Sequence, residues 1–266
     1  MDETNRQQLY DHAKKWVLEA GYHIKDRIDD PLSIDTKENP NDLVTEMDRH
    51  TEKVIAEKIA TTYPDHKLLS EEGFGHDISD LAGVVWIVDP IDGTMNFVHQ
   101  KRNFAISVGI FIDGVGEIGL IYNVMEDTLY NVQRGKGAFK NGEKLPNLED
   151  RKLEEAIIGL NNFWTSENRK VDEKKMQKLV RKVRGTRSYG SAALEFAFVA
   201  EGIVDAYLTM NLAPWDIAAG VILVNEVGGI TTTADGKELD MLNKSTVLTC
   251  NPSLYHQIVN EYVDLK

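Results

Sequence analysis

The sequence predicts an α/β fold in which layers of helices and sheets alternate and the chain forms two subdomains. Near the N-terminus, at residues 9–28, apolar side chains recur at helical spacing. From residue 104 to residue 139 the pattern changes to short strands joined by turn-forming residues. A polar segment without periodicity, residues 144–152, follows. We place the boundary in this segment, which gives subdomains of residues 1–145 and 146–266.

Two amphipathic helices are expected in the first subdomain. Residues 9, 13, 16, 17, 20, 24 and 28 form the apolar face of the first helix. Val54, Ile55 and Ile59 mark the second helix, and Pro64 ends it because proline cannot donate a backbone hydrogen bond. Asp48 lies in the first turn of this second helix.

The strands that follow are expected to form an antiparallel meander. They are predicted at residues 105–112, 117–123, 129–133 and 138–139, with turns at 113–114, 126–127 and 135–137. Residues 114–119 match the dinucleotide-binding pattern Gly-x-Gly-x-x-Gly, but that motif must open a helix to bind a dinucleotide. Because residues 120–124 continue as a strand, we assign these glycines to a hairpin.

The second subdomain alternates strands with helices. Strands are predicted at 156–160 and 204–208, and helices at 171–183, from Gly190-Ser191, at 217–227 and from Ser253, with further short strands before the last helix. This alternation completes the layered α/β prediction.

The most informative segment begins with an apolar run at residues 84–88, which is typical of a buried strand. The run ends in Asp89-Pro90-Ile91-Asp92. Pro90 has no N–H and a fixed φ, so the chain is expected to turn there rather than continue its ladder. Both carboxylates can then face one point, and the Ile91 carbonyl can be presented there as a further oxygen.

Gly93 and Thr94 come next, at the expected start of a helix. Their unhindered N–H groups are suited to hold a phosphate. Oxygen ligands beside an anion-binding turn indicate hard divalent cations and phosphate ester chemistry. The alternative is an ordinary strand-to-turn segment with capping aspartates, since Asp-Pro and Asp-Gly are common turn formers.

The composition argues against two classes of partner. A net charge of −13 and a pI near 5.0 disfavour nucleic acids and anionic membranes, which would require a basic patch. No apolar run approaches the about 18 residues of a membrane span, and Met1-Asp2-Glu3 does not resemble a signal peptide. We therefore expect a cytoplasmic protein that acts on a small molecule.

Three more segments accompany residues 86–97. They are residues 41–48 (Asn-Asp-Leu-Val-Thr-Glu-Met-Asp), 70–73 (Ser-Glu-Glu-Gly) and 213–220 (Ala-Pro-Trp-Asp-Ile-Ala-Ala-Gly). In this order they resemble the inositol monophosphatase family of magnesium-dependent, lithium-sensitive phosphatases, from about residue 37 to residue 229. The resemblance implies a sandwich of alternating helix and sheet layers, an active site at the junction of the subdomains, and a homodimer.

The resemblance also implies a set of ligands for two to three Mg²⁺ ions. Glu71, Asp89 and the Ile91 carbonyl would hold the first ion. Asp89, Asp92 and Asp216 would hold the second, with Asp89 as the bridge, and a third, weaker ion would share Glu71. Asp216 stands at the start of its helix, where it could also cap free N–H groups.

Thr94 and Asp48 form a second functional unit by the same resemblance. The Thr94 hydroxyl would help to position the nucleophilic water, and Asp48 would orient that hydroxyl; with Glu71 they make up the expected catalytic set. The helix N-terminus near Asp48 should favour its ionised form. Asp42 and Thr45 are expected to cap and brace the loop.

The substrate is expected to lie against Asp92, Gly93 and Thr94 through its phosphate. Small residues at Gly190 and Ala192 either allow the backbone to approach the substrate closely or allow tight helix packing, and the sequence favours neither reading. By resemblance, Asp92 and the Ala192 backbone could hold a polyol.

The sequence departs from the family pattern at Thr209. Inositol-preferring members carry a glutamate there, which accepts hydrogen bonds from inositol hydroxyls. Losing a charged acceptor could cost about 1.5–3 kcal/mol of binding. The altered pocket could instead admit a larger alcohol, such as the ribose of an adenosine 2′-phosphate or a sugar phosphate.

The predicted function is Mg²⁺-dependent hydrolysis of small phosphate monoesters by metal-activated water, with inositol monophosphate as the leading substrate. NADP(H) 2′-phosphatase or fructose-1,6-bisphosphatase activity is the alternative within this class. A non-catalytic module that binds metal and phosphorylated ligands is the alternative outside it. That last reading would be favoured if a metal ligand or Thr94 were missing, and the sequence has all of them.

Overall fold

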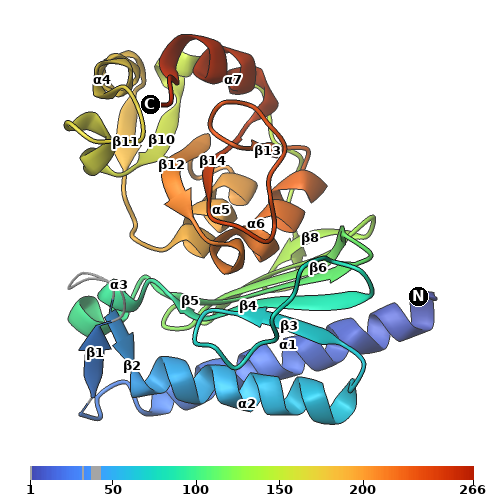
Figure 1. Ribbon diagram of the computed structural model, residues 1–266. Coiled ribbons are helices and arrows are strands. Elements are labelled where there is room, and N and C mark those ends of the chain that lie inside the picture. The colour runs from blue at the N-terminus through green and yellow to red at the C-terminus, as the bar shows by residue number, and fades with distance from the viewer. Residues whose placement is uncertain (1, 32, 37–42) are drawn as a thin grey trace.

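Helices and sheets alternate in layers in the computed structural model, which describes residues 2–31, 33–36 and 43–266. The two long helices α1 (Glu3–Asp26) and α2 (Glu46–Thr62) lie against one face of a seven-stranded sheet (Figure 1). Helices α5 (Ala192–Glu201) and α6 (Pro214–Glu226) cover its other face and separate it from a five-stranded sheet. This arrangement confirms the layered α/β prediction.

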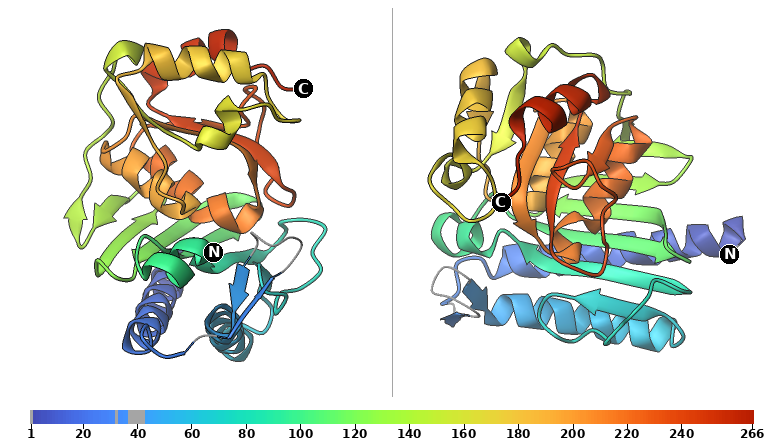
Figure 2. Two further views of the ribbon diagram at one scale, coloured as in Figure 1. Left: turned by 90° about the vertical axis from the view of Figure 1, so that its left-hand side faces the viewer. Right: turned by 45° about the horizontal axis from the view of Figure 1, so that its top comes forward.

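The outermost layer contains α4 (Glu173–Lys182) and α7 (Pro252–Gln257), with a π-helical turn, η3 (Ile258–Tyr262), after α7. Figure 2 shows this layer on the side of the molecule opposite to α1 and α2. None of the helices in the described part of the chain is long and apolar enough to cross a membrane.

The seven-stranded sheet contains the predicted meander. In spatial order its strands are β3 (Lys67–Ser70), β4 (Val84–Asp92), β5 (Ala105–Ile112), β6 (Val115–Asn123), β7 (Thr128–Gln133), β8 (Gly137–Lys140) and β9 (Glu143–Lys144). Strands β3 and β4 are parallel, and the other neighbours are antiparallel. The Gly-x-Gly-x-x-Gly residues lie in the β5–β6 hairpin, which confirms that they do not open a helix.

Strand β4 continues further than expected. The sequence predicts a turn at Pro90, but β4 remains paired with β5 at Asp92, opposite Ala105. The register shifts between Asp89 and Asp92, so the chain accommodates the missing proline N–H with a bulge and then resumes pairing. The predicted helix does start at Thr94, as α3 (Thr94–Gln100).

The five-stranded sheet belongs to the second half of the chain. In spatial order its strands are β11 (Gly185–Arg187), β10 (Ile157–Leu160), β12 (Ala206–Leu212), β14 (Ser245–Cys250) and β13 (Ile230–Thr232). Strand β10 is parallel to both its neighbours, and β14 is antiparallel to both of its own. Two 3₁₀ turns, η1 (Leu153–Glu155) and η2 (Asn162–Thr165), flank β10.

The two sheets lie on either side of the predicted subdomain boundary, but they share one core. Helix α6 belongs to the second half and packs directly on the first sheet, where a Cβ on Gly109 would lie 2.7 Å from the Ala218 Cβ. A Cβ on Gly119 would lie 2.8 Å from the Ala219 carbonyl oxygen. The division at residues 145 and 146 therefore stays a prediction.

Several element boundaries differ from those predicted. Helix α1 ends at Asp26 rather than at residue 28, and α6 begins at Pro214 rather than at residue 217, because proline is favoured in the first helical turn. The sequence analysis did not identify the hairpin strands β1 (Ile34–Thr36) and β2 (Leu43–Thr45), nor β3, β9 and β11. These strands have two to four residues, too few for an apolar period to stand out.

Candidate active site

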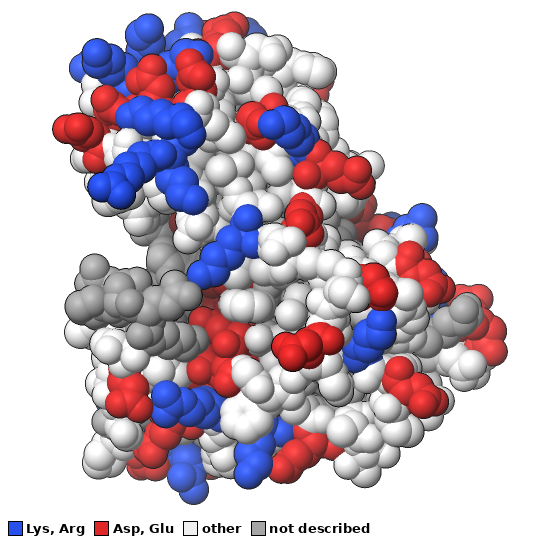
Figure 3. All heavy atoms as spheres, viewed as in Figure 1, with Lys and Arg blue, Asp and Glu red and all other residues white. Residues whose placement is uncertain are grey.

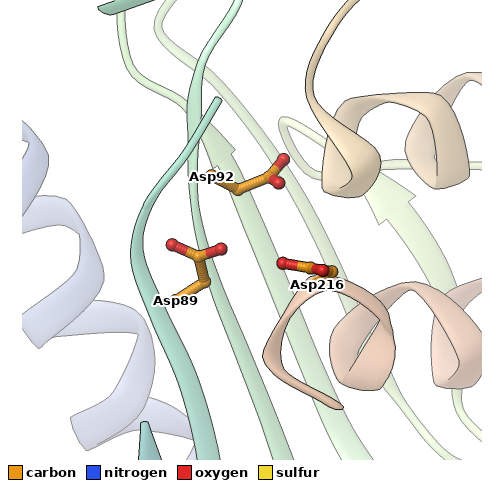
Figure 4. A group of neighbouring side chains, drawn as sticks. All are labelled: Asp89, Asp92 and Asp216. Atoms are coloured by element: carbon orange, nitrogen blue, oxygen red, sulfur yellow. The ribbon is translucent and has the colours of Figure 1, made fainter. Parts of the chain in front are cut away.

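Three aspartates converge where the first sheet meets α6. Asp89 and Asp92 lie at the end of β4, and Asp216 lies in the first turn of α6. One carboxylate oxygen of each lies within 4.8 Å of one oxygen of both others. Figure 4 shows the three carboxylates turned toward one another from these two elements. The structure therefore brings together, from both halves of the chain, the carboxylates that the sequence analysis selected.

The bulge in β4 orients Asp89 and the neighbouring carbonyl. The Ile91 N–H donates to Asp89 Oδ1 at 3.0 Å. Thr94 Oγ1 lies 3.1 Å from the Ile91 carbonyl oxygen, so this oxygen is at the same end of the strand as the aspartates. The expected carbonyl ligand is thus beside the cluster.

Asp92 is held by the start of α5. The Ser191 hydroxyl donates to its Oδ2, as does the Ala193 N–H at 2.8 Å, and the Ala192 N–H donates to Oδ1 at 3.2 Å. The Ala192 N–H, which was expected to face a polyol, is therefore bonded to Asp92 in this structure. The capping expected of Asp216 is confirmed, since its Oδ2 accepts from the Ala213 N–H at 2.7 Å.

Gly190 is a position where packing requires glycine. Its φ is +77°, and a Cβ there would lie 2.9 Å from Asn96 Nδ2. Asn96 in turn donates to the carbonyls of Asn103 and Tyr189, at 2.8 and 2.7 Å. These contacts favour the tight-packing reading of Gly190, although the residue also lines the pocket described below.

The clustered carboxylates strongly favour a cation among them. Burial, followed by the charges of Glu71 and Asp92, raises the pKa of Asp89 well above its usual value. Burial and the charge of Asp92 do the same to the pKa of Asp216, although Lys244 acts in the opposite direction. Figure 3 shows acidic side chains gathered at the level where the two halves of the molecule meet.

Glu71 belongs to this cluster although it comes from a different loop, directly after β3. Its carboxyl raises the pKa of Asp89 through its charge and through a side-chain hydrogen bond. Its charge also contributes to the raised pKa values of Asp92 and Asp216. The donor set is therefore carboxylate and carbonyl oxygen, which is the set that Mg²⁺ prefers, and the residues present fit such an ion.

Asp48 and Thr94 are in hydrogen-bonding contact, as predicted. Thr94 Oγ1 lies 3.0 Å from Asp48 Oδ1. The other oxygen, Oδ2, accepts from the Thr45 hydroxyl at 2.5 Å and from the Thr45 N–H at 2.9 Å, which completes a capping box. The capping role of Thr45 is thus confirmed, whereas Asp42 lies outside the described residues.

Burial acts against the expected effect of the helix N-terminus on Asp48. The helix N-terminus was expected to favour the ionised form, but burial raises the pKa of Asp48 to about 6. The hydrogen bonds from Thr45 and Thr94 lower it, and they do not offset the loss of water around a side chain with 0% exposure. Desolvation therefore outweighs the helix N-terminus here.

A pocket of about 250 Å³ opens beside Asp92 and Asp216. Thr209 lines it, as do Tyr207 from the same strand and Trp164 from η2. Gly190 and Ala192 also border it, so the residues predicted for the substrate's alcohol lie along one cavity next to the carboxylates.

Sequence reasoning missed Glu195, which also lines this pocket. Its side chain is only 2% exposed, and burial raises its pKa to about 7. Oε1 accepts from the Tyr189 N–H at 2.8 Å, while Oε2 has no hydrogen-bond partner within the described residues. A signal was available, because Glu195 is an acid within the apolar segment of residues 192–200.

Known proteins that are similar to this chain identify its family. The sequence matches the profile of the inositol monophosphatase family over residues 5–265. Inositol-1-monophosphatase of Bacillus subtilis (strain 168) is 54% identical over 260 residues, which cover 98% of both chains. Fructose-1,6-bisphosphatase/inositol-1-monophosphatase of Thermotoga maritima is 36% identical over 237 residues, covering 87% of this chain and 88% of the relative.

Solved structures give the same result. Crystal structures of SaIMPase-II bound to inositol monophosphate and to 2′AMP have 41% and 42% identity and TM-scores of 0.87 and 0.89. Both alignments cover 96% of this chain; they cover 93% of the chain bound to inositol monophosphate and 94% of the chain bound to 2′AMP. An IMPase/NADP phosphatase complexed with NADP and Ca²⁺ has 30% identity and a TM-score of 0.90, with 99% and 100% coverage. The chain therefore belongs to the inositol monophosphatase family and is a phosphatase.

Proposed function

We propose that this protein hydrolyses small phosphate monoesters with Mg²⁺, and that inositol monophosphate is its leading substrate. The observation that carries the proposal is the convergence of Asp89, Asp92 and Asp216 beside a hydroxyl that is hydrogen-bonded to a buried carboxyl, Thr94 to Asp48. The 54% identity to an inositol-1-monophosphatase supports the choice of substrate.

Five oxygen donors would hold two to three Mg²⁺ ions. Glu71, Asp89 and the Ile91 carbonyl would hold one ion, and Asp89, Asp92 and Asp216 another. When bound, such ions neutralise phosphoryl and alkoxide charge and lower the pKa of water. The raised pKa values of the carboxyl cluster support this assignment, because a cation relieves the repulsion that contributes to them.

The protein's own groups would orient the attack. Thr94 has one hydroxyl proton and two neighbouring acceptors, Asp48 Oδ1 and the Ile91 carbonyl. When the Thr94 hydroxyl donates its hydrogen bond to Asp48, a lone pair of Oγ1 is free to accept a hydrogen bond from the attacking water, which orients that water. The backbone at Gly93 would receive the phosphoryl oxygens, where its φ of +93° requires glycine.

A second candidate is the hydrolysis of a bulkier ester, such as NADP(H) at the 2′-phosphate or fructose 1,6-bisphosphate. Thr209 favours it, because a short hydroxyl lines the pocket where inositol-preferring members carry a glutamate. The similarity to proteins solved with 2′AMP and with NADP also favours it. Glu195 nevertheless gives the pocket a buried carboxyl, so an acceptor for polyol hydroxyls is not lost.

A panel of phosphate esters tests the proposal. The purified protein is assayed with inositol 1-phosphate, 2′AMP, NADP⁺ and fructose 1,6-bisphosphate, with Mg²⁺ and with EDTA. We expect Mg²⁺-dependent release of phosphate, with the highest kcat/KM for inositol 1-phosphate. Release from none of the four would contradict the function, and a higher kcat/KM for NADP⁺ would replace the leading substrate with the second candidate.

The same family resemblance supports a cytoplasmic homodimer as a further part of the proposal. Size-exclusion chromatography with light scattering measures the mass in solution directly. A mass of one chain, about 30 kDa, would contradict the dimer.

A further inference from the structure

A buried glutamate on α2 holds the loop that carries Glu71. Glu52 has 0% exposure and lies one helical turn after Asp48. Its Oε1 accepts from the Ser70 hydroxyl at 2.7 Å and from the Phe74 N–H at 2.9 Å. Its Oε2 accepts from the Glu72 N–H at 2.6 Å. The residues immediately before and after Glu71 are thus both bound to one carboxyl group.

The chemistry of this contact requires an acceptor at both oxygens. The three groups that face Glu52 are one hydroxyl and two backbone N–H groups, and all of them donate. An ionised carboxylate accepts at both oxygens, whereas a glutamine would turn an NH₂ group toward one of these donors. Burying the carboxylate is costly unless it is hydrogen-bonded, and the three bonds supply that compensation.

The base of the loop is fixed independently. The His76 N–H donates to the Leu68 carbonyl at 2.7 Å, and the Leu68 N–H donates to His76 Nδ1 at 2.9 Å. A Cβ on Gly75 would lie 2.7 Å from the Leu68 carbonyl oxygen, so the returning chain runs close to β3. The base therefore closes without Glu52, and the Glu52 contacts act on the segment that presents Glu71.

We propose that Glu52 is a positioning residue for the metal site, which sets the direction of Glu71 toward Asp89 by anchoring its two chain neighbours. The proposal rests on the proposed function, because Glu71 is a ligand there. Groups that orient a ligand typically contribute about 10–100-fold to metal affinity. Glu52 would thus be part of the site although it does not touch the metal, the substrate or the reacting atoms.

The test compares Glu52→Gln with a matched variant at Glu226. Glu226 also anchors a loop through backbone N–H groups, those of Gly135 at 2.9 Å and Gly137 at 2.7 Å, and lies at the far end of α6 from Asp216. Mg²⁺ binding to the metal-free proteins is measured by calorimetry. Amide hydrogen exchange at Glu72 and Phe74 is measured in EDTA. Thermal unfolding in EDTA measures how much each substitution destabilises the whole protein.

We expect Glu52→Gln to weaken Mg²⁺ binding by about 10–100-fold and to accelerate exchange at Glu72 and Phe74. Glu226→Gln should lower the thermal stability about as much as Glu52→Gln does, but it should leave the Mg²⁺ affinity within about twofold of that of the wild type. Equal losses of affinity in the two variants would overturn the proposal, because they would show a general effect of destabilisation. Faster exchange in Glu52→Gln with unchanged Mg²⁺ affinity would overturn it as well.

Ser70→Ala provides the test should Glu52→Gln fail to fold. It keeps the carboxylate and removes one of its three donors, so we expect Mg²⁺ binding to weaken by about fivefold. Unchanged affinity would contradict the proposal. If the wild-type protein binds Mg²⁺ and hydrolyses phosphate esters, and these variants do so equally well, the role of Glu52 is refuted while the proposed function stands. A wild-type protein that does neither would refute the proposed function itself.

Discussion

The four aspartates of the site divide into two kinds. Asp48 and Asp92 each accept three hydrogen bonds from described residues, and the pKa of each is raised only to about 6. Asp89 and Asp216 each accept one backbone hydrogen bond, and their pKa values are raised well above the usual range. Hydrogen bonds partly offset the burial of the first kind, whereas the larger pKa shifts of the second kind favour a bound cation.

The largest effect should follow a change in the second kind. Asp89→Asn removes the carboxylate that would bridge two ions, and we expect kcat at saturating Mg²⁺ to fall by at least about 10²–10³-fold. Circular dichroism should show an unchanged fold, since the amide oxygen can still accept from Ile91. Activity within tenfold of wild type would show that Asp89 does not bridge the ions.

A somewhat smaller effect is expected for the first kind. Thr94→Ala and Asp48→Asn should each lower kcat by about 10²-fold or more, because the first removes the hydroxyl and the second removes the carboxylate that orients it. If the residues act as a unit, the double variant should lose no more than the worse single variant. The measurement is a double-mutant cycle in log kcat, and fully additive losses would mean that the two residues work independently.

Asp92 also lines the alcohol pocket, but Thr209 is the position there that departs from the family pattern, so we assign selectivity to it. Thr209→Glu adds an acceptor for inositol hydroxyls and a charge that repels an anionic dinucleotide. A hydrogen bond to a charged group contributes about 1.5 kcal/mol. We therefore expect the ratio of kcat/KM for inositol 1-phosphate to kcat/KM for NADP⁺ to rise by about tenfold. An unchanged ratio would show that Thr209 does not face the substrate.

The smallest expected effect is on the stability of the metal-free protein. A carboxyl whose pKa is raised by folding binds more protons in the folded state than in the unfolded state. Its contribution to stability therefore falls as the pH rises above about 4, the usual pKa of aspartate. In EDTA at pH 8, Asp89→Asn should raise Tm by about 2–4 °C, the shift produced by about 1 kcal/mol, and the gain should vanish near pH 4.

Asp48→Asn is the control for this stability measurement. Its amide nitrogen would face donors that now bind a carboxylate, so we expect Tm in EDTA to fall rather than rise. If both variants lower Tm at pH 8, the division of the aspartates into two kinds is wrong.

Sequence patterns sufficed for those parts of the fold and site that depend on local order. Apolar periodicity predicted the meander, and Gly93-Thr94 predicted the start of a helix directly after the oxygen-rich segment. Asp216 and Glu71 were selected only through the family resemblance. No local pattern relates them to β4, which lies far away in the sequence.

What the sequence did not reveal depends on contacts between distant segments. Ser191 holds Asp92 across 99 positions, and Glu52 holds the Glu71 loop across about 20. The raised pKa of Asp48 was not predicted because a position in the first turn of a helix does not disclose how deeply the side chain is buried. The β4 bulge was misjudged because Pro90 interrupts pairing without ending the strand.

The seating of α6 on the first sheet has a consequence for the spacing of the site. Asp89 is fixed to the sheet and Asp216 to α6, so the separation of these carboxylates is determined by how closely the helix approaches Gly109 and Gly119. A single methyl group at either glycine would increase the distance between the helix and the strand. The spacing of the metal site is thus set in part by two residues that carry no side chain and no charge, of which Gly109 pairs with Ile87, two positions before Asp89.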